Sequence, residues 1–249
     1  MSEKTAMAKP RAARPRVSAS KAARIGAASD IAAAPRGKGR AIGLQKGRQS
    51  TRDEIVEKKH SIVRKEIVTA AVELFANRGY RAVTMEDIAA ELEYTKSVVY
   101  YYFKNKNDLL WNIFRDFVDL YSADIAAVRK QDLPCREAFS KMVYRHAMNV
   151  MTNPAGAAVY HREESELTQQ QRSVLSKIKR DYDAVLEALF QQGISEGIFR
   201  DVPPHVAVSG ILGMCNSLYA WYNPMGALTA EDIANHYATL LSEGYLGQG

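Results

Sequence analysis

The stretch that most constrains the fold of this chain is residues 84–110, TMEDIAAELEYTKSVVYYYFKNKNDLL. It predicts two short helices joined by a turn, near Thr84–Leu92 and Thr95–Tyr101. Thr84 and Thr95 stand where N-cap residues are expected, because a threonine oxygen accepts a hydrogen bond from a free N–H of the first turn. Helices this short are not stable by propensity alone. Two small helices packed on a larger neighbour are typical of a helix-turn-helix DNA reader.

The residues before this stretch predict the helix on which it packs. Ile67, Ala71, Leu74 and Phe75 recur at helical spacing, and Gly79 follows as a C-terminal cap, so we expect a helix at residues 61–78. The three helices would share a core made of Ile67, Leu74, Phe75, Ile88, Val99 and Phe103.

After Lys106 every periodic segment is helical, and neither strand-like alternation nor an internal repeat occurs. The expected helices lie at residues 107–129, 134–154, 155–166, 168–193, 205–222 and 230–246. We therefore predict an all-α chain of about nine helices. A three-helix DNA-binding domain would occupy residues 56–106, and a helical ligand-binding and dimerisation domain residues 107–249.

The net charge of +6 conceals a division of the chain. Residues 1–52 hold 13 Lys/Arg and 2 Asp/Glu, a balance of +11, and the remainder holds 21 against 26, a balance of −5. Residues 1–55 have no apolar residues at helical spacing, so we predict that they are disordered. A basic arm of this kind favours a polyanionic partner. A solvated leader, an organelle transit peptide or a misassigned start would give the same composition.

Several classes of protein and site are disfavoured by the sequence. No run approaches the roughly 18–20 apolar residues of a membrane span. Cys135 and Cys215 are too far apart in sequence to suggest a disulfide framework or a zinc site, so a reducing cytoplasm is expected. The five histidines are scattered, and no phosphate loop, nucleophile elbow or zinc-protease motif is present. We therefore predict no metal, no cofactor and no catalytic residue.

The segment at residues 205–222 is apolar nearly all round and carries several small residues, which predicts burial on every side. It is either an internal core helix or, with the last helix, half of a four-helix bundle completed by a second copy of the chain. In the second interpretation, which we favour, the dimer interface contains Val206, Gly210, Gly213, Ser217, Ile233, Tyr237 and Leu240.

The pattern of the first domain resembles the tetracycline-repressor (TetR) family of bacterial regulators. The matching residues are Leu74-Phe75 with Gly79, Thr84 with Ile88-Ala89, and Tyr100, Tyr102, Phe103, Lys106 and Leu109-Leu110. Two positions depart from the family's pattern. Glu93 occupies the turn between the reader helices, where the family often has glycine, and Ser97 stands where glycine or proline is frequent. Because glutamate does not tolerate positive φ as glycine does, we expect an altered or strained turn.

The resemblance implies which residues contact DNA. Thr84, Tyr100 and Lys106 would bind phosphates and fix the register. The residues that would face base edges are Thr95, Lys96, Ser97, Val98 and Tyr101, while Tyr102 would serve either role. Lys96 would suit a guanine, and Val98 the methyl group of a thymine. The tyrosine run could instead pack as an aromatic cluster, but consecutive helical positions point in different directions, so at least one must face outward.

The resemblance further implies a homodimeric, ligand-responsive transcriptional regulator, a repressor rather than an activator, whose partners are operator DNA and a small-molecule effector. An apolar, aromatic effector pocket would contain Phe114, Phe117, Tyr121, Tyr144, Tyr160, Arg162, Tyr182 and Tyr219. Within the polar run His161–Glu164, Arg162 or His161 would face an anionic part of the ligand, unless the run is simply a solvated helix face. The C-terminal pattern loosely resembles members that sense acyl-coenzyme A or lipid-derived compounds.

Two other classes of protein remain open. One is a helical enzyme or carrier in which the helix-turn-helix-like segment arose by chance. The other is a DNA-architectural protein that acts through its basic N-terminal segment alone.

Overall fold

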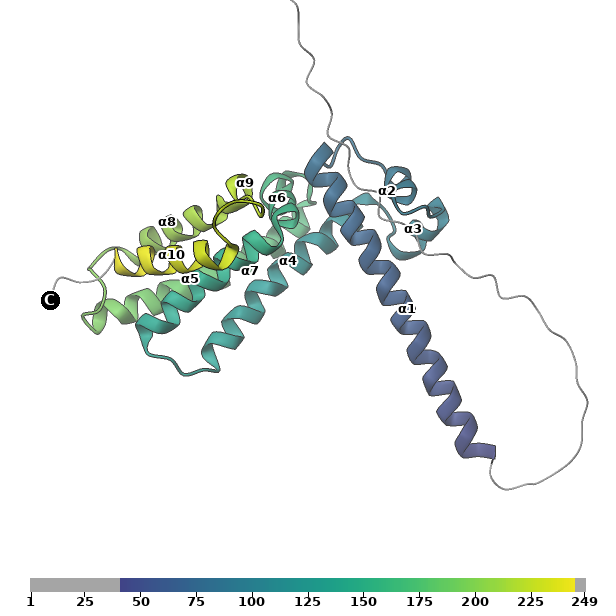
Figure 1. The fold of residues 1–249 in the computed structure, drawn as a ribbon, viewed down its shortest axis with the longest axis horizontal. Helices are drawn as coiled ribbons and strands as arrows, with labels where there is room; N and C mark the ends of the chain where they lie inside the picture. The colour runs from purple at the N-terminus through teal and green to yellow at the C-terminus, as the bar shows by residue number, and fades with distance from the viewer. Residues whose placement is uncertain (1–40, 245–249) are drawn as a thin grey trace, which may run out of the picture. The chain divides into compact units, whose positions relative to one another are not determined.

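The computed structural model describes the backbone of residues 41–244, and the side chains of residues 54–240, 243 and 244. This part of the chain is helical and contains no β-strand, which confirms the predicted all-α fold (Figure 1). The elements are α1 Ala41–Arg78, α2 Met85–Glu91, α3 Lys96–Tyr102, α4 Lys106–Arg129, α5 Cys135–Thr152, α6 Pro154–Arg162, the 3-10 helix η1 Glu164–Glu166, α7 Gln169–Ser195, α8 Pro204–Asn216, α9 Leu218–Trp221 and α10 Ala230–Glu243.

Helix α1 begins earlier than the sequence analysis predicts. It starts at Ala41, so the prediction of disorder is wrong for residues 41–55, while residues 1–40 lie outside the described part. These helical residues include Gln, Lys, Arg and Glu, whose straight side chains lose little freedom in a helix. A helix already nucleated by its packed C-terminal half extends through them at small cost. Residues 54–62 are exposed, so packing alone does not mark this part of the helix.

The first three helices form the predicted unit. Ile67, Phe75 and Ile88 are completely buried, and Val99 and Phe103 complete the core, whereas Leu74 is half-buried at its edge. Helix α2 begins with a capping box. Thr84 Oγ1 accepts a hydrogen bond from the Asp87 N–H at 3.1 Å, and Asp87 Oδ2 accepts one from the Thr84 N–H at 2.8 Å.

The turn between α2 and α3 is strained at the position that the sequence singles out. Glu93 has a φ of 56°, in the left-handed region. Its N–H donates to the Ala90 carbonyl at 3.2 Å, and the Tyr94 N–H donates to the Ala89 carbonyl at 2.8 Å, which together make a Schellman motif. Glycine is the usual residue at this place in the motif, so the predicted strain is confirmed.

Replacing this residue by glycine (Glu93→Gly) is expected to raise the free energy of unfolding by roughly 0.5–1 kcal/mol. Glycine removes the free-energy cost of a left-handed backbone at a residue with a Cβ. Part of this gain is offset, because glycine loses more conformational entropy on folding than glutamate does. Urea unfolding measures it. Glu91→Gly, at the last residue of α2, is the matched control and should destabilise by about 1 kcal/mol. Equal losses for both variants would contradict the strain at Glu93.

The remaining helices form the second part of the fold (Figure 1). Helix α4 leaves α3 after a short link, α5 packs against α4 and α7, α8 packs against α5 and α7, and α10 lies along α5. The segment predicted as one helix at 205–222 is divided at Ser217, whose Oγ donates to the Met214 carbonyl at 2.7 Å and so competes with helical bonding. None of the described helices is both long and apolar enough to cross a membrane.

Candidate nucleic-acid interface and ligand cavity

Helix α3 presents a polar and aromatic face to solvent. Thr95 precedes it at the N-cap, where its side chain makes no capping hydrogen bond. Lys96 and Ser97 are exposed, Tyr100 is 40% exposed and Tyr101 is 74% exposed. The expectation that at least one tyrosine faces outward is therefore confirmed. These side chains lie together on the surface of a short helix that is fixed from below by a buried core.

The third tyrosine of the run lies differently. Tyr102 is half-buried, and its ring centroid is 4.4 Å from that of His60 on α1. Tyr101 contacts the same histidine edge-on at 5.7 Å. Part of the run thus does form an aromatic cluster, which holds the end of α3 against α1. Val98 is only half-exposed.

Lys96 is the cation at the start of α3. Its ammonium forms an ion pair with Glu86 of α2 and lies 5.4 Å from the centroid of the Tyr100 ring. Both partners are exposed, and an exposed ion pair of this kind contributes little to stability. Lys96 is therefore able to exchange Glu86 for another hydrogen-bond acceptor at low cost.

Lys106 has a different environment from the one expected. Its Nζ donates hydrogen bonds to the carbonyl oxygens of Tyr80 at 2.9 Å and Val83 at 2.8 Å, and it lies 4.3 Å from the Tyr80 ring centroid. The ammonium is therefore committed to the loop between α1 and α2. In this placement the ammonium does not point freely to solvent, as a phosphate contact would require. Its role is structural, because it bonds the first residue of α4 to the loop between α1 and α2.

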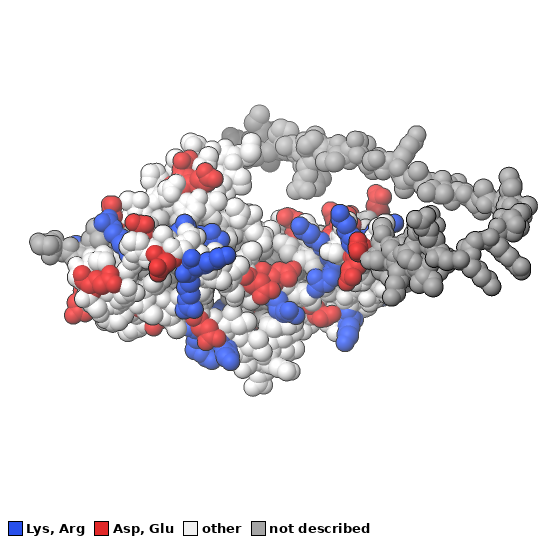
Figure 2. All heavy atoms as spheres, turned by 90° about the horizontal axis from the view of Figure 1, so that it is seen from below, with Lys and Arg blue, Asp and Glu red and all other residues white. Residues whose placement is uncertain are grey.

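The charged side chains on the face drawn in Figure 2 are interspersed. Lys and Arg lie beside Asp and Glu, and neither sign forms a large continuous patch on that face. A broad basic surface is what sequence-independent DNA binding would need. The face drawn in Figure 2 thus offers no broad basic surface for such binding.

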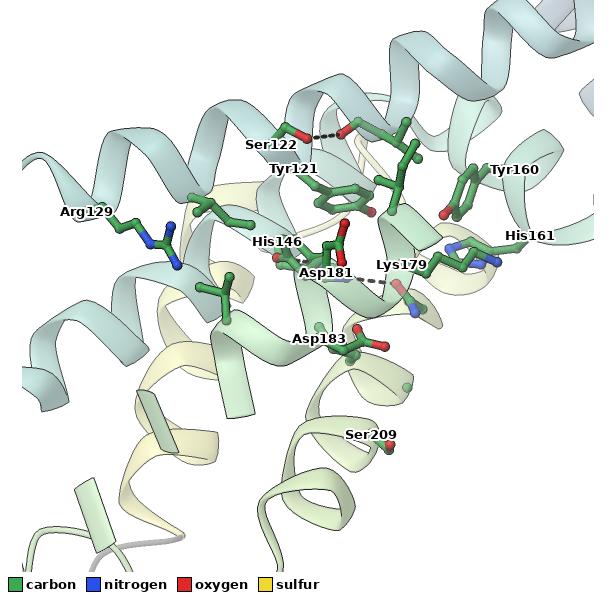
Figure 3. A pocket seen from close by; sticks show the side chains of 18 residues that line it. Tyr121, Ser122, Arg129, His146, Tyr160, His161, Lys179, Asp181, Asp183 and Ser209 are labelled. Atoms are coloured by element: carbon green, nitrogen blue, oxygen red, sulfur yellow. Dashed lines mark hydrogen bonds between the residues drawn. The ribbon is translucent and has the colours of Figure 1, made fainter. Parts of the chain in front are cut away.

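The second domain contains a cavity of about 720 Å³ that is open to solvent on one side, where Arg129 and Asp181 are exposed (Figure 3). Its walls come from α4, α6, α7 and α8, with His146 contributed by α5. The apolar residues that line it are Val118, Ile125, Ile178, Val185, Leu212 and Gly213. The polar ones are Tyr121, Ser122, Arg129, His146, Tyr160, His161, Lys179, Asp181, Tyr182, Asp183, Ser209 and Asn216. A volume of this size suits a small organic ligand.

One side of the cavity is a hydrogen-bonded group centred on His146. Its Nδ1 lies 3.0 Å from the Tyr182 hydroxyl and its Nε2 lies 2.8 Å from Asn216 Oδ1. Tyr121 stacks on the imidazole with ring centroids 4.7 Å apart. Burial lowers the pKa of His146 to about 4, and the hydrogen bond to Asn216 only partly opposes this. His146 is therefore neutral at pH 7.

Two other polar atoms at the cavity have no partner within the described residues. They are the hydroxyl of Tyr121 and Nε2 of His161, both buried. Burial also lowers the pKa of His161 to about 4, with the positive charge of Lys179 acting in the same direction. Both atoms belong to side chains that line the cavity.

The segment after His161 joins the cavity wall to the reader. Arg162 Nη2 donates to the Ala76 carbonyl of α1 at 2.7 Å. Glu163 Oε1 accepts from the Tyr80 N–H at 3.2 Å, and the side chain of Arg81 pairs with Glu166 at 2.8 Å. On the same side, Asn107 Nδ2 of α4 donates to the Glu166 carbonyl at 3.1 Å. Helix α6 and η1 are thus bonded directly to the end of α1 and to the loop that follows it.

The face of α8 that turns away from the core carries apolar and small residues. Val206 is 53% exposed and Met214 42% exposed, and Trp221 of α9 and Leu240 of α10 are 52% and 61% exposed. Of the residues expected at a dimer interface, those exposed here are Val206, Gly210, Gly213, Ser217 and Leu240. The other two differ: Tyr237 is half-buried, and Ile233 packs inside its own chain.

Comparison with known proteins gives matches over both domains. Residues 67–112 match the model of the bacterial regulatory proteins of the tetR family, and residues 132–245 match a tetracyclin repressor-like C-terminal domain. A solved transcriptional regulator of the TetR/AcrR family from Thermobifida fusca is 30% identical, with a TM-score of 0.59, over 73% of this chain and 97% of its own. The chain belongs to the TetR family. It is a DNA-binding transcriptional regulator.

Two further relatives match a similar part of the chain. The transcriptional repressor KstR2 of Rhodococcus jostii is 25% identical over 183 residues, 73% of this chain and 90% of its own length. The structure of AibR in complex with isovaleryl coenzyme A and operator DNA is 29% identical, with a TM-score of 0.64, over 71% of this chain and 96% of its own.

The cavity of this TetR-family chain contains only part of the expected pocket set. Tyr121, Tyr160 and Tyr182 line it. Phe114 and Phe117 lie behind Tyr160 instead, with ring centroids 5.1 and 4.6 Å from its own. The aromatic residues of α4 were thus correctly placed on one stripe, but Phe114 and Phe117 are buried in the core and only Tyr121 lines the cavity.

Three further expected pocket residues do not line the cavity. Tyr144 lies in a groove between α5 and α10, because it is on the side of α5 away from α4. Arg162 points to α1, as its bond to Ala76 requires, whereas its neighbour His161 faces the ligand space. Tyr219 stacks on His161 with ring centroids 5.3 Å apart and supports it from behind.

The sequence analysis missed most of the polar wall, above all His146, Lys179, Asp181 and Asp183. The last three alternate along α7, at positions 179, 181 and 183. His146 offered one usable signal, because it lies among apolar residues on the inward face of its helix.

Proposed function

We propose that this TetR-family protein is a homodimeric repressor that a small molecule, bound in the cavity of α4, α6, α7 and α8, releases from its operator. One observation carries the proposal: two walls of that cavity, α4 and α6, are the elements bonded to the DNA reader. The ammonium of Lys106 and the side chain of Arg162 make two of these bonds, and Glu163 and Glu166 make others. A change in the cavity therefore has a short physical route to α3.

The route requires that the ligand distinguish two states of the protein. A molecule that prefers an arrangement in which α4 and α6 are displaced shifts the population toward that arrangement, by no more than its difference in affinity. Arg162 then moves the end of α1, and Lys106 moves the loop before α2. Both displacements change the direction of α3 relative to the DNA.

Operator recognition needs two readers at a fixed separation. In a symmetric dimer, one α3 from each subunit would enter successive major grooves on one face of the duplex, with half-sites roughly 34–36 Å apart. The exposed apolar residues Val206 and Met214 of α8, Trp221 of α9 and Leu240 of α10 support a dimer through this domain, because exposed apolar surface marks interaction sites. Such a regulator would act on DNA in a bacterial cytoplasm.

The effector class is supported by the relatives' names. AibR was crystallised with isovaleryl coenzyme A and operator DNA. A fatty acid metabolism regulator of Bacillus subtilis is 25% identical over 140 residues, 55% of this chain and 70% of its own length. These names favour an acyl-coenzyme A or a lipid-derived compound as the effector. The apolar residues of the cavity suit the acyl part.

The decisive experiment compares binding to the DNA upstream of the protein's own gene with binding to random duplex, by fluorescence anisotropy at fixed salt. A specific regulator prefers its own DNA, and so does the chain that lacks residues 1–40. An architectural protein that acts through its basic segment would lose binding on this truncation. A full-length chain with no preference for any upstream sequence would refute the proposal.

Replacing Lys96 by alanine should relax base preference at one position of each half-site, by roughly 1–3 kcal/mol of discrimination. Lys104→Ala is the matched control, because Lys104 is also exposed but follows α3. It should weaken binding to all sequences alike and lower the salt dependence. Anisotropy against a set of single-base operator variants measures both. A uniform loss for Lys96→Ala would show that Lys96 does not read a base.

A further inference from the structure

The two unpartnered atoms at the cavity define what the effector must offer there. Tyr121 is 7% exposed, and its hydroxyl has no partner within the described residues. The same is true of Nε2 of His161. Unpaired buried polar groups are rare in native proteins, and each one calls for a reason. Figure 3 shows the Tyr121 hydroxyl and the His161 ring on the sides of one shared space, with the Tyr160 hydroxyl beside them.

The surroundings hold these groups rigidly. The Tyr121 ring stacks on His146 at 4.7 Å and contacts Phe117 edge-on at 5.3 Å. The His161 ring is stacked on Tyr219 at 5.3 Å. Neither side chain is free to turn toward another protein partner without losing these contacts. Their hydrogen-bonding capacity is therefore directed at the cavity.

The charges around this place disfavour an anion. Lys179, the nearest cation, forms a 2.5 Å ion pair with Glu164. Asp181 and Asp183 of α7 also line the cavity, and Arg129 is the other cation in its wall. Two carboxylates and two cations thus line the cavity, and one of these cations is already paired with Glu164 outside the lining. Burial raises the pKa of the Tyr121 hydroxyl and lowers that of His161, so both groups are uncharged at pH 7. A carboxylate placed here would lose its water and would have to compete with Glu164 for Lys179.

We propose that the Tyr121 hydroxyl and Nε2 of His161 bind one uncharged oxygen, that of a carbonyl or hydroxyl group, in the otherwise apolar part of the effector. This inference rests on the proposed function in one respect, namely that the molecule bound in the cavity is the effector. A carbonyl accepts from the Tyr121 hydroxyl, and a second hydrogen bond comes from the imidazole in its Nε2–H tautomer. A hydroxyl group accepts from Tyr121 and donates to the other tautomer.

The same contact would connect ligand chemistry to the reader. His161 precedes Arg162, whose guanidinium holds the Ala76 carbonyl of α1. A ligand that draws the imidazole toward its oxygen displaces the last turn of α6, and with it this bond. A purely apolar molecule of the same size fills the cavity without engaging His161. The uncharged oxygen is thus the part of the effector that causes the displacement of α6.

The test uses two probes of equal chain length, 2-nonanone and nonanoate, in calorimetric titrations of the full chain at pH 7.5. The wild type should bind the ketone more tightly than the carboxylate. Tyr121→Phe keeps the ring and its stacking, and should weaken ketone binding roughly threefold to tenfold, the value of one hydrogen bond. Nonanoate binding should not change. Tyr144→Phe is the matched control, because Tyr144 lies outside the cavity, and should behave as the wild type.

Each other outcome overturns the assignment. Equal ketone affinity in the wild type and Tyr121→Phe means that the hydroxyl is not a ligand contact. Tighter binding of nonanoate means that the place accepts an anion. Absence of ketone binding up to its solubility limit means that an uncharged oxygen is not sufficient. Thermal unfolding checks that the unliganded variant is folded; its midpoint should not fall, since the lost hydroxyl has no partner. Operator binding by the same samples decides separately on the proposed function.

Discussion

Replacing Arg145 by methionine is expected to lower the free energy of unfolding by about 3 kcal/mol. The partner of Arg145 is Asp124 of α4, which is 4% exposed. Asp124 accepts hydrogen bonds from Arg145 Nε at 2.5 Å and from Asn149 Nδ2 at 2.6 Å. Without the guanidinium, a buried carboxylate keeps only a neutral amide. The expected loss lies at the lower end for broken buried pairs, because the Arg145 side chain is itself 36% exposed.

Urea unfolding of two further variants isolates this effect. Arg136→Met removes an exposed arginine of the same helix, which pairs with Glu243 at 3.7 Å, and should cost less than about 1 kcal/mol. Adding Asp124→Leu to Arg145→Met should recover much of the loss, because the unpaired carboxylate is then gone. Equal losses of unfolding free energy for Arg136→Met and Arg145→Met would show that the buried carboxylate of Asp124 does not need the guanidinium of Arg145.

Acid should destabilise the protein through His146. Its pKa is about 4 in the folded protein, against 6.5 for an exposed histidine. Between these values the unfolded chain binds a proton that the folded chain does not, so the free energy of unfolding falls as the pH falls. The contribution is fully present above pH 6.5 and is lost on the way to pH 4. It amounts to about 3 kcal/mol for a shift of this size.

Acidic groups also titrate in this range, so the measurement is a difference between variants. His146→Leu should have a shallower dependence of the unfolding free energy on pH between 6.5 and 4 than the wild type. His236→Leu is the control, since His236 is exposed on α10, and its profile should run parallel to that of the wild type. Parallel profiles for the wild type and His146→Leu would show that this histidine stays accessible to protons.

The reader could be predicted from the sequence because its constraints are local. Capping residues, the spacing of Ile67, Phe75 and Ile88, and the departure at Glu93 all act within a few turns of chain. The cavity could not be predicted in the same way. Aromatic residues such as Phe114 and Tyr121 share a helix stripe, and only the neighbouring helices decide which is buried and which lines a space.

Long-range polar contacts were also out of reach of the sequence. Nothing local marks Asp124 as buried, since its partners lie on the next helix. Lys106 is a further case: the resemblance implies a phosphate contact, but it does not reveal that Lys106 also binds carbonyl groups 23 and 26 residues earlier. The start of α1 was missed because an exposed helix has no apolar stripe.

The helix-turn-helix unit of α1, α2 and α3 is bonded to α4 through Lys106 and to α6 through Arg162. The affinity of a ligand for the cavity is therefore a different quantity from its effect on DNA binding. If α4 and α6 move relative to each other, these bonds displace the helix-turn-helix unit. A compound that binds in the cavity without displacing α4 relative to α6 leaves α3 in place and does not change DNA binding. Occupancy of the cavity and release from DNA are therefore separate properties of this regulator. A compound that binds without effect competes with the effector for the same cavity.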